Sequence, residues 1–436
     1  MTTTHLNNKK TITAWATYDL ANSVYNLVIT ATIFPIYYNA VTSLKDEQGN
    51  IINNTVQFLG FGIKNTALYD FAIAFSYLLI AIIIPLLSGI ADYSGNKKSF
   101  MKFFCYLGAA ACSSMYFFDN TNIGYGILMA TLACIGFSGS MVFYNAYLPE
   151  IASNDMQDKV SAKGFAMGYW GSSILLIICL ALVLTSDTGA EKLLMMRYAF
   201  VFVGIWWFGF AQIPFFILPD GESKNTSKKE NKFLKGYTEI KKVFFELKAN
   251  KQLIIFLPAF FAYSMGVQTV MLVANHFGSD EIKMESAQLI TTILIIQFVA
   301  MGGAYLFSYM SRKIGNIKTL IIATFIWICI CLGTYLFVYT PSTFYVVAAF
   351  VGLVMGGIQS LSRSTYSKLL PETNDHASYF SFYDVCEKLS IVFGMATFGL
   401  ITQISSTMRT PILALMVFFV VGFLGLLAIP KSKSLD

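Results

Sequence analysis

The chain carries little charge. Asp, Glu, Lys and Arg make up 12% of its 436 residues, whereas 56% are hydrophobic and the mean hydropathy is +0.61. A soluble domain carries roughly twice that share of charged residues. The apolar runs are also too long and too frequent for the core of a soluble protein, so the composition excludes that class.

Signatures of enzymes and metalloproteins are missing too. The seven cysteines fall within the apolar stretches and have no spacing that indicates a disulfide framework or a zinc site. The sequence has no Walker loop, metal-ligand cluster or nucleophile elbow. Gly164, Gly168 and Gly171 follow no strand, so they predict a face for close helix packing and not a nucleotide loop. We therefore expect no catalytic residue, no metal and no cofactor.

Long apolar stretches dominate what is present. A helix that crosses a membrane needs about 20 mostly apolar residues. About twelve stretches reach that length, six in each half of the chain. They lie at roughly 13–41, 66–90, 100–118, 122–147, 164–185, 197–218, 252–275, 287–310, 318–339, 344–366, 379–403 and 411–430.

Lysine and arginine predict the orientation of these spans. If the amino terminus is cytoplasmic, the inner side receives Lys9, Lys10, Lys97, Lys98 and the lysine-rich segment 224–251, and few basic residues remain outside. That bias fits the positive-inside rule with both termini cytoplasmic, as in a multi-pass protein of the cell (inner) membrane. The net charge of +6 is then a topology signal and does not indicate nucleic-acid binding. The first apolar stretch is too long for a signal peptide.

A polar segment divides the chain. We expect one six-helix bundle at 1–218, a second at 252–436, and a cytoplasmic linker at 219–251. Within the linker, apolar residues step by four, three, four and three, which is one stripe of a helix. They are Phe233, Tyr237, Ile240, Phe244 and Leu247. This amphipathic helix fits either the surface of the anionic inner leaflet or the ends of the bundle, with a calmodulin-type target as a third reading.

One pattern occurs twice. Residues 88–98 (Ser-Gly-Ile-Ala-Asp-Tyr-Ser-Gly-Asn-Lys-Lys) return about 220 residues later as 308–318 (Ser-Tyr-Met-Ser-Arg-Lys-Ile-Gly-Asn-Ile-Lys). A Leu-Pro-Glu motif that follows a tyrosine repeats with the same spacing, at 144–150 and 366–372. Two related halves around a midplane site are the architecture of a secondary transporter.

The first copy resembles the signature loop of the major facilitator superfamily, through Asp92, Gly95, Lys97 and Lys98. The resemblance implies that the aspartate faces the amino-terminal end of helix eleven, near 377–381, and closes the cytoplasmic side. An anion at a helix amino terminus is stabilised by roughly 0.3–1 kcal/mol. The other gating candidates are Glu150, Arg312 and Glu372, and we expect Arg312 to pair with Asp155 or Asp158.

Further segments resemble the vacuole-effluxer-like branch of that superfamily. They are 15–25, 144–150, 163–171, 357–364 and 382–388. The resemblance implies export of small organic solutes, because eukaryotic members release amino acids from vacuoles. The chain departs from the branch at Met265, where an aspartate is frequent, and at Asp384, where an asparagine is common.

Helix one carries a polar face of its own. Asp19, Asn22, Asn26 and Thr30 recur at helical spacing, with Tyr25 adjoining. Asp19 lies roughly 10 Å into the span, and charged groups at such depth face the bundle interior or a water-filled cavity. The face predicts a cavity wall that binds a substrate amine or a coupling cation. The alternative is a hydrogen-bonded cluster that only packs helices together.

Other polar residues within the spans are weaker candidates. Asp384 and Lys388 lie four apart on one helix and are expected to pair, with Glu387 pointing elsewhere. Arg363 is expected to hold an anionic substrate group or a gate carboxylate such as Glu150 or Glu372. The remaining substrate or coupling candidates are Tyr144, Asn145, Tyr263, Gln268, Gln359 and Tyr383, with Gln297 beside them.

Together these patterns predict an all-α, twelve-span major facilitator fold that works by alternating access. We expect a monomer that exports a small organic solute, such as an amino acid or a related amphiphile, and couples its movement to protons through Asp19. The alternatives are a cation-coupled sugar symporter that uses sodium or protons and Asp70, and a non-transporting receptor or scaffold without a continuous polar cavity. Membrane lipid and the solute are the expected partners.

Overall fold

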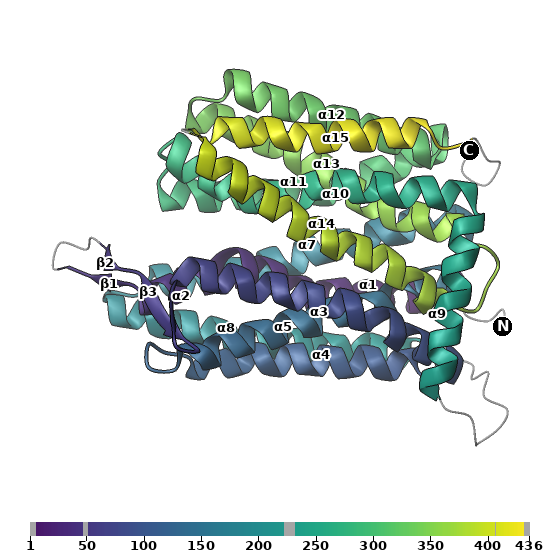
Figure 1. The fold of residues 1–436 in the computed structure, drawn as a ribbon, viewed down its shortest axis with the longest axis horizontal. Helices are drawn as coiled ribbons and strands as arrows, with labels where there is room; N and C mark the ends of the chain where they lie inside the picture. Colours follow the sequence, from purple (N-terminus) through teal and green to yellow (C-terminus); the bar gives the residue numbers. More distant parts are fainter. Residues whose placement is uncertain (1–5, 47–50, 222–231, 406, 431–436) are drawn as a thin grey trace.

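The computed structural model describes residues 6–46, 51–221, 232–405 and 407–430. Its helices lie side by side in two groups (Figure 1). The first group consists of α1 (Lys9–Val24), η1 (Tyr25–Ile33), α2 (Phe34–Thr42), α3 (Asn65–Ser94), α4 (Lys97–Ser114), η2 (Met115–Phe117), α5 (Ile123–Asn145), α6 (Leu148–Ile151), α7 (Asn154–Leu184) and α8 (Gly189–Ile217). After α9 (Lys232–Ala249), the second group consists of α10 (Lys251–His276), η3 (Phe277–Glu281), α11 (Ser286–Ile314), α12 (Asn316–Phe337), α13 (Pro341–Leu369), α14 (His376–Ile404) and α15 (Arg409–Leu427).

In the described part of the chain, eleven helical segments are long and apolar enough to cross a membrane. The first of them is the continuous run of α1, η1 and α2. The twelfth span is α4, an 18-residue helix that is more charged than the others because it contains Lys97, Lys98 and Lys102. It packs side by side with two of the spans, α5 and α8. The expectation of about twelve spans, six in each half, is confirmed, and the protein is a multi-pass membrane protein.

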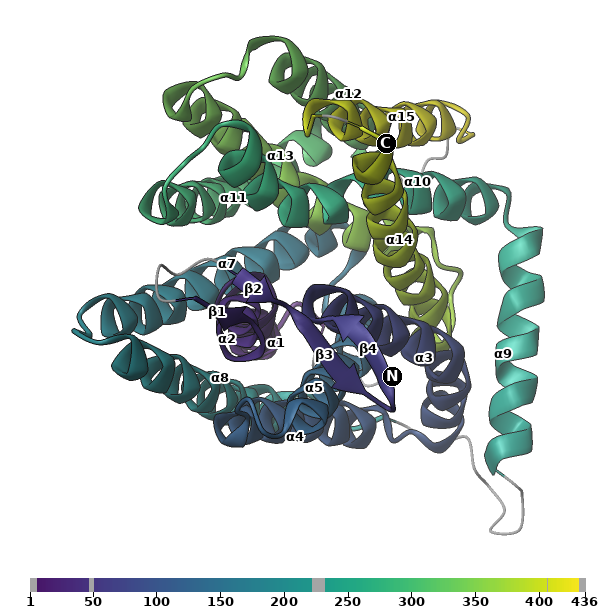
Figure 2. The ribbon, with the colours of Figure 1, turned by 60° about the vertical axis from the view of Figure 1, so that its left-hand side comes forward.

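The two groups are related bundles that meet through equivalent helices (Figure 2). α7, the fifth span of the first half, packs on α11, the second span of the second half. In the same way α14, the fifth span of its own half, packs on α3, the second span of the first half. This reciprocal packing is the pseudo-symmetric arrangement that the internal repeat predicts.

Both repeated loops turn at a glycine with positive φ. Gly95 ends α3 with φ of +69° and Gly315 ends α11 with φ of +88°. Residues other than glycine rarely adopt such positive φ values. Both copies therefore reverse the chain at the glycine, and the next span begins within two residues, at Lys97 and at Asn316.

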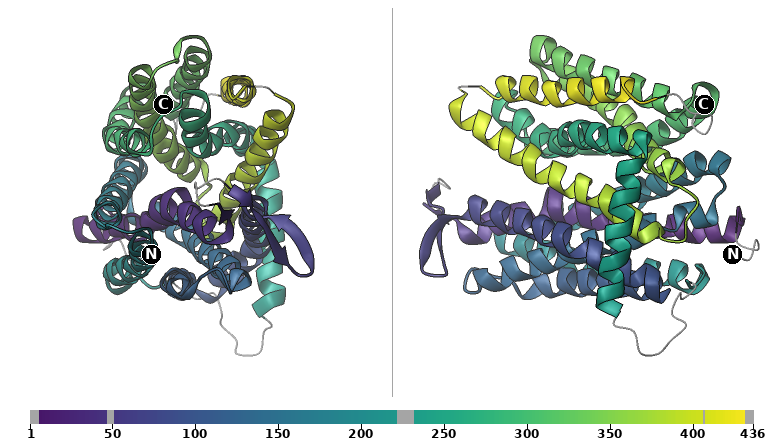
Figure 3. Two further views of the ribbon diagram at one scale, coloured as in Figure 1. Left: turned by 90° about the vertical axis from the view of Figure 1, so that its left-hand side faces the viewer. Right: turned by 45° about the vertical axis from the view of Figure 1, so that its right-hand side comes forward.

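The two ends of the molecule differ. Both termini and α9 lie at one end, here called the α9 end (Figures 1 and 3). The opposite end carries two small hairpins, in which β1 (Leu44–Lys45) pairs with β2 (Ile51–Asn53) and β3 (Thr55–Phe58) pairs with β4 (Phe61–Lys64). We call it the hairpin end.

Candidate functional site

A cavity of about 210 Å³ lies between the two halves. Polar side chains from both halves line it, including Asp19 and Asn22 of α1 and Gln268 of α10. Its full lining is Asp19, Asn22, Ser23, Asn26, Leu27, Thr30, Ala31, Tyr77, Phe137, Met141, Phe165, Tyr169, Ser172, Gln268, Gln297, Met355, Gln359, Glu387, Lys388 and Ile391. The face predicted on helix one thus lies along a cavity wall.

The first span changes its winding beside the cavity. η1 is a π-helix, which is rare and frequent at functional sites. Asn26, Leu27, Thr30 and Ala31 of this segment all line the cavity. Since α1 begins at the α9 end, the cavity extends along these positions from Asp19 toward the hairpin end.

An ion pair joins the halves beneath the cavity. Nη1 of Arg363 on α13 lies 3.2 Å from Oδ2 of Asp19 on α1, and both side chains are buried. The hydroxyl of Tyr144 donates to the same carboxylate oxygen at 2.7 Å. Arg363 also donates to Oγ and to the backbone oxygen of Ser161, both at 2.9 Å, and to Oδ1 of Asn145 at 3.3 Å. The guanidinium is therefore held by three elements of the first half.

The helices around this pair approach very closely. The ring of Trp15 stacks on that of Tyr144 with centroids 4.5 Å apart, and the guanidinium carbon of Arg363 lies 4.8 Å from the Trp15 ring centroid. A Cβ at Gly164 of α7 would lie 2.5 Å from Oδ2 of Asp19 and 2.9 Å from Nη2 of Arg363. The small-residue face predicted on this helix is confirmed. At Gly164 the absence of a side chain leaves room for the Asp19–Arg363 ion pair.

A second charged group lies on α14, and we call Asp384, Glu387 and Lys388 the Lys388 cluster. Nζ of Lys388 lies 3.4 Å from Oδ1 of Asp384 and 3.0 Å from Oε2 of Glu387. Asp384 is fully buried behind the cavity, whereas Glu387 and Lys388 line it. Gln268 donates to Oε1 of Glu387 at 3.3 Å, so this carboxylate contacts α10 as well. The expected pairing of Asp384 with Lys388 is present.

Toward the α9 end, Asp92 of α3 caps α14. Its Oδ2 accepts from the backbone N–H of Ser378 at 2.7 Å, and its Oδ1 from that of Ala377 at 3.3 Å. Both donors belong to the first turn of α14, where a carboxylate is stabilised by the helix dipole. The contact that the resemblance implied, near 377–381, is therefore present.

Glu150 completes the contacts around that helix end. Lys97 forms an ion pair with Glu150, and Nδ1 of His376 lies 2.9 Å from the other oxygen of the same carboxylate. Beside them, Lys98 pairs with the exposed Asp220 at 2.8 Å. Hydrogen bonding from Lys98 lowers the pKa of the Asp220 carboxyl below its usual value.

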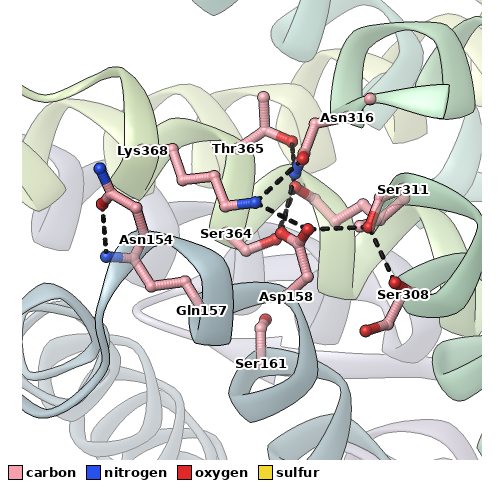
Figure 4. A network of polar contacts seen from close by, with 12 residues as sticks. Asn154, Gln157, Asp158, Ser161, Ser308, Ser311, Asn316, Ser364, Thr365 and Lys368 are labelled. Atoms are coloured by element: carbon pink, nitrogen blue, oxygen red, sulfur yellow. Dashed lines mark hydrogen bonds and ion pairs between the residues drawn. The ribbon is translucent and has the colours of Figure 1, made fainter. Parts of the chain in front are cut away.

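Residues of the second copy of the repeat donate hydrogen bonds to a different carboxylate, that of Asp158 on α7 (Figure 4). Oδ2 of Asp158 accepts from Ser311 at 2.8 Å and from Nζ of Lys368 at 2.7 Å, and Oδ1 accepts from Asn316 at 2.8 Å. Asp158 is 1% exposed, so these second-half donors satisfy a buried charge from the first half. We call these four residues the Asp158 cluster.

The expected pairing of Arg312 is wrong. Its side chain is exposed, with the guanidinium 5.7 Å from the ring centroid of Tyr309, and it contacts neither Asp158 nor Asp155. Asp155 accepts from Ser153 instead, at 2.6 Å. One residue is about 100° of helical rotation, so the face of α11 that turns Ser311 toward α7 turns Arg312 away from it.

The gate partners suggested for Arg363 are also wrong. Its carboxylate partner is Asp19, while Glu150 is held by Lys97 and Glu372 lies exposed on the loop before α14. Arg363 cannot reach these two carboxylates because it lies six residues before the end of α13, deeper in the span than Glu150 and Glu372.

Several predicted substrate residues lie outside the cavity lining. Tyr144, Asn145, Arg363 and Asp384 support the buried charges next to it, as described above. Tyr25 packs between Phe137 and Trp207, with centroids at 5.1 and 6.0 Å. Tyr263 shares a hydrogen bond of 2.6 Å with Ser362. Tyr383 stacks on Phe260 at 4.2 Å.

Four polar lining residues were not predicted as cavity residues from the sequence, namely Tyr77, Tyr169, Ser172 and Glu387. The hydroxyl of Tyr169 donates to Oε1 of Gln359 at 2.6 Å, which links the two halves. Phe165, Tyr169 and Ser172 step by four and three along α7, beside the glycine face, and this spacing is the signal that could have identified them. Asp70, which the symporter alternative requires, is exposed on α3 and outside the cavity lining.

The contacts between the halves described above all lie between the Tyr169–Gln359 hydrogen bond and the α9 end. The molecule is thus closed at that end. Within the described residues, no group of three or more His, Cys, Asp or Glu side chains is placed to hold a metal ion.

Comparisons with known proteins identify relatives over the whole chain. A family model described as vacuole effluxer Atg22 like matches residues 7–436. YxiO of Bacillus subtilis, an uncharacterized MFS-type transporter, is 29% identical over 428 residues, which cover 97% of this chain and 95% of YxiO. Autophagy-related protein 22 of Kluyveromyces lactis is 26% identical over 392 residues, covering 82% of this chain and 77% of that protein.

Solved structures share the fold. The proton:xylose symporter XylE superposes with a TM-score of 0.73 at 12% identity, covering 98% of this chain and 97% of XylE. The transporter FucP, in an outward conformation, gives 0.68 at 12% identity, with 97% and 99% covered. A bacterial homologue of ferroportin in an outward-facing state gives 0.66 at 10% identity, with 96% and 98% covered. At such identities the likeness shows the fold alone.

Proposed function

This chain belongs to the vacuole effluxer Atg22-like family of the major facilitator superfamily, and from that membership we propose that it exports amino acids or related small amphiphiles by proton-coupled alternating access. It is a membrane transporter and not an enzyme. The substrate class, the direction and the coupling ion are the proposed part.

The mixed charge of the cavity carries the substrate proposal. Lys388 offers an ammonium group and Glu387 a carboxylate at neighbouring positions of α14, and amides such as Asn22 and Gln268 line the same space. An amino acid presents one group of each sign, so both of its charges can be paired when it leaves water. Apolar side chains such as Phe137 suit its remaining atoms.

The closed α9 end supports alternating access. To open there, the protein has to separate Asp92 from α14, Asp158 of α7 from its second-half donors, and Arg363 from Asp19. These contacts are short and specific, and a rocking motion of one bundle against the other removes all of them together. The cavity then becomes accessible from the α9 end.

We place the α9 end in the cytoplasm, with both termini there and the protein in the cell membrane. The positive-inside rule supports this orientation, since α1 begins at the α9 end with Lys9 and Lys10, and α4 begins there with Lys97 and Lys98. The proposed units are the bundles 1–218 and 252–436 and the linker 219–251, and the proposed functional state is a monomer.

Asp19 is the proposed coupling residue. A proton on its carboxylate removes the charge that holds Arg363, so protonation weakens the closure between the halves directly below the cavity. Proton symport by XylE and by the Escherichia coli fucose transporter FucP supports proton coupling on this fold. The exposed position of Asp70 speaks against the sodium or sugar alternative.

Counterflow in proteoliposomes tests the proposal. Vesicles loaded with mixed unlabelled amino acids should exchange labelled amino acids, and an imposed pH gradient should drive net uptake in the inverted orientation without sodium. Exchange of sugars but not amino acids contradicts the substrate class, and stimulation by sodium alone contradicts the coupling.

The receptor or scaffold alternative needs a separate measurement. Asn22→Cys and Asn26→Cys, each labelled from one side at a time, should react from either side in a cycling transporter. Reactivity from one side only, under every gradient and substrate, contradicts alternating access.

A further inference from the structure

One face of α9 is bound to the protein. The helix crosses the ends of the spans, upright in Figure 1 where the spans run across the view. Val243 and Leu247 are buried, and a Cβ at Gly236 would lie 2.6 Å from Cγ1 of Ile90 on α3. Ile90 lies about one turn before the end of α3 at Ser94, which places α9 at the level of the membrane surface.

The two flanks of α9 differ in depth. On one flank, Lys242 lies 3.4 Å from Asp375, at the start of α14. Near the other flank, Phe244 packs on Phe382, with ring centroids 6.2 Å apart. Phe382 lies seven residues further along α14, about 10 Å deeper in the span. The Phe244 flank therefore faces the bilayer, and the Lys242 flank faces water.

The deeper flank bears an exposed stripe of aromatic and basic residues. Tyr237, Lys241, Phe244 and Lys248 step by four, three and four, with Phe245 adjoining, and all five are exposed. Nζ of Lys248 lies 4.7 Å from the ring centroid of Phe244. The side chains of residues 232–235, including Phe233 and Lys235, lie outside the described residues. We call the five residues the α9 stripe.

We propose that the α9 stripe binds the headgroups of anionic phospholipids in the adjacent leaflet. Aromatic rings suit the boundary between headgroups and acyl chains. Lysine stems extend along apolar surface and place their ammonium groups at the phosphates. Lys242 is already paired with Asp375, so the charges available to lipid are those of Lys241 and Lys248. The helix thus contacts the bundle with one face and lipid with another, which combines the leaflet-surface reading with the bundle-end reading.

Fluorescence quenching in vesicles tests this site on the full chain. In a Cys329→Ser background, a bimane label at Tyr237→Cys reports on the stripe, and a label at Ala249→Cys reports on the exposed opposite flank. The vesicles are phosphatidylcholine with a small fraction of nitroxide-labelled phosphatidylglycerol or nitroxide-labelled phosphatidylcholine. Position 237 should be quenched at least threefold more by the labelled phosphatidylglycerol, since each lysine near the surface contributes about fivefold in affinity. Position 249 should be quenched little by either lipid.

The charge variants separate lipid from other occupants. Lys241→Gln with Lys248→Gln should remove the phosphatidylglycerol preference at position 237 while quenching by both lipids persists. The matched variant, Lys9→Gln with Lys10→Gln at the same end, should keep the preference, and inorganic phosphate should not compete. Equal quenching by the two lipids at position 237 would overturn the headgroup site. Quenching there no greater than at position 249 would place the stripe in water, available to a soluble partner, and would also overturn it.

Discussion

The carboxylate of Asp19 and the guanidinium of Arg363 lie 3.2 Å apart although 344 positions separate them in the chain. One belongs to the first span and the other to the tenth, so the pair joins the two halves directly beneath the polar cavity. This ion pair has to break in any conformation that is open at the α9 end.

Neutralising only Asp19 should destabilise the protein. Asp19→Asn leaves the buried guanidinium of Arg363 without its counter-charge, which costs about 3–5 kcal/mol in such pairs. The melting temperature in detergent should fall by several degrees, and pH-driven transport should be lost. An Asp19→Asn protein as stable as the parent contradicts the proposed stabilising role of the pair.

The double variant Asp19→Asn with Arg363→Gln is the control for that loss. With both charges removed, most of the stability should return, because no unpaired charge is left in the interior. Transport should remain absent if Asp19 couples it to protons. Recovery of pH-driven transport in the double variant argues against Asp19 as the coupling residue.

Removing the charge of Asp92 should favour the state that is open at the α9 end. Asp92→Asn weakens a helix-terminal contact worth about 0.3–1 kcal/mol, and up to about 2 when partly buried. An impermeant maleimide applied at that end should label Ala146→Cys, a buried position beside Asn145, severalfold faster in the variant.

Asp220→Asn is the matched control. Its carboxylate also pairs with a lysine of the repeated loop, Lys98, but its side chain is 88% exposed. Exposed pairs contribute about 0–1 kcal/mol. The labelling rate should therefore stay at the parental value, and equal acceleration in both variants would mean that the loss of any nearby charge, and not the helix cap, produces the effect.

A methyl group at Gly164 should disturb the Asp19–Arg363 pair. Gly164→Ala places a Cβ within 2.5 Å of Oδ2 of Asp19. Overpacking of this kind costs about 1–3 kcal/mol, so both thermal stability and transport should fall. Gly209→Ala on α8 makes the same chemical change with nothing within 4 Å, and it should be neutral. Equal effects of the two substitutions contradict the close approach.

Lys388 should be needed for both folding and substrate. Lys388→Met leaves the fully buried Asp384 without its cation, at a cost of about 3–5 kcal/mol. Adding Asp384→Asn should restore stability but not exchange of amino acids, because the cavity still lacks its ammonium group. Exchange at the parental rate in the double variant contradicts the proposed substrate contact.

Most of the fold could be predicted from local sequence patterns. Apolar length predicted the spans, and the internal repeat predicted two related halves, each of which turns at a glycine with positive φ, Gly95 or Gly315. The helix-one face of Asp19, Asn22 and Asn26 followed from helical spacing. The resemblance to a known loop supplied the contact between Asp92 and α14.

Contacts between helices that are distant in the sequence could not be predicted from it. Arg363 meets Asp19 only because α13 and α1 pack side by side, and no local pattern encodes that register. The same limit misassigned Arg312, where a rotation of one residue on α11 decides which side chain meets α7. Glu387 was missed for this reason too, since the direction it faces depends on neighbouring helices.

The Asp158 cluster makes the two halves unequal partners. Its donors Ser311 and Lys368 correspond, in the internal repeat, to Ala91 and Ala146 of the first half. Two copies of the first half assembled as a homodimer would bury Asp158 twice with neither the hydroxyl nor the ammonium group in place. The complementarity between the halves therefore runs one way at this cluster, because the first half supplies the buried charge and only the second half supplies its donors.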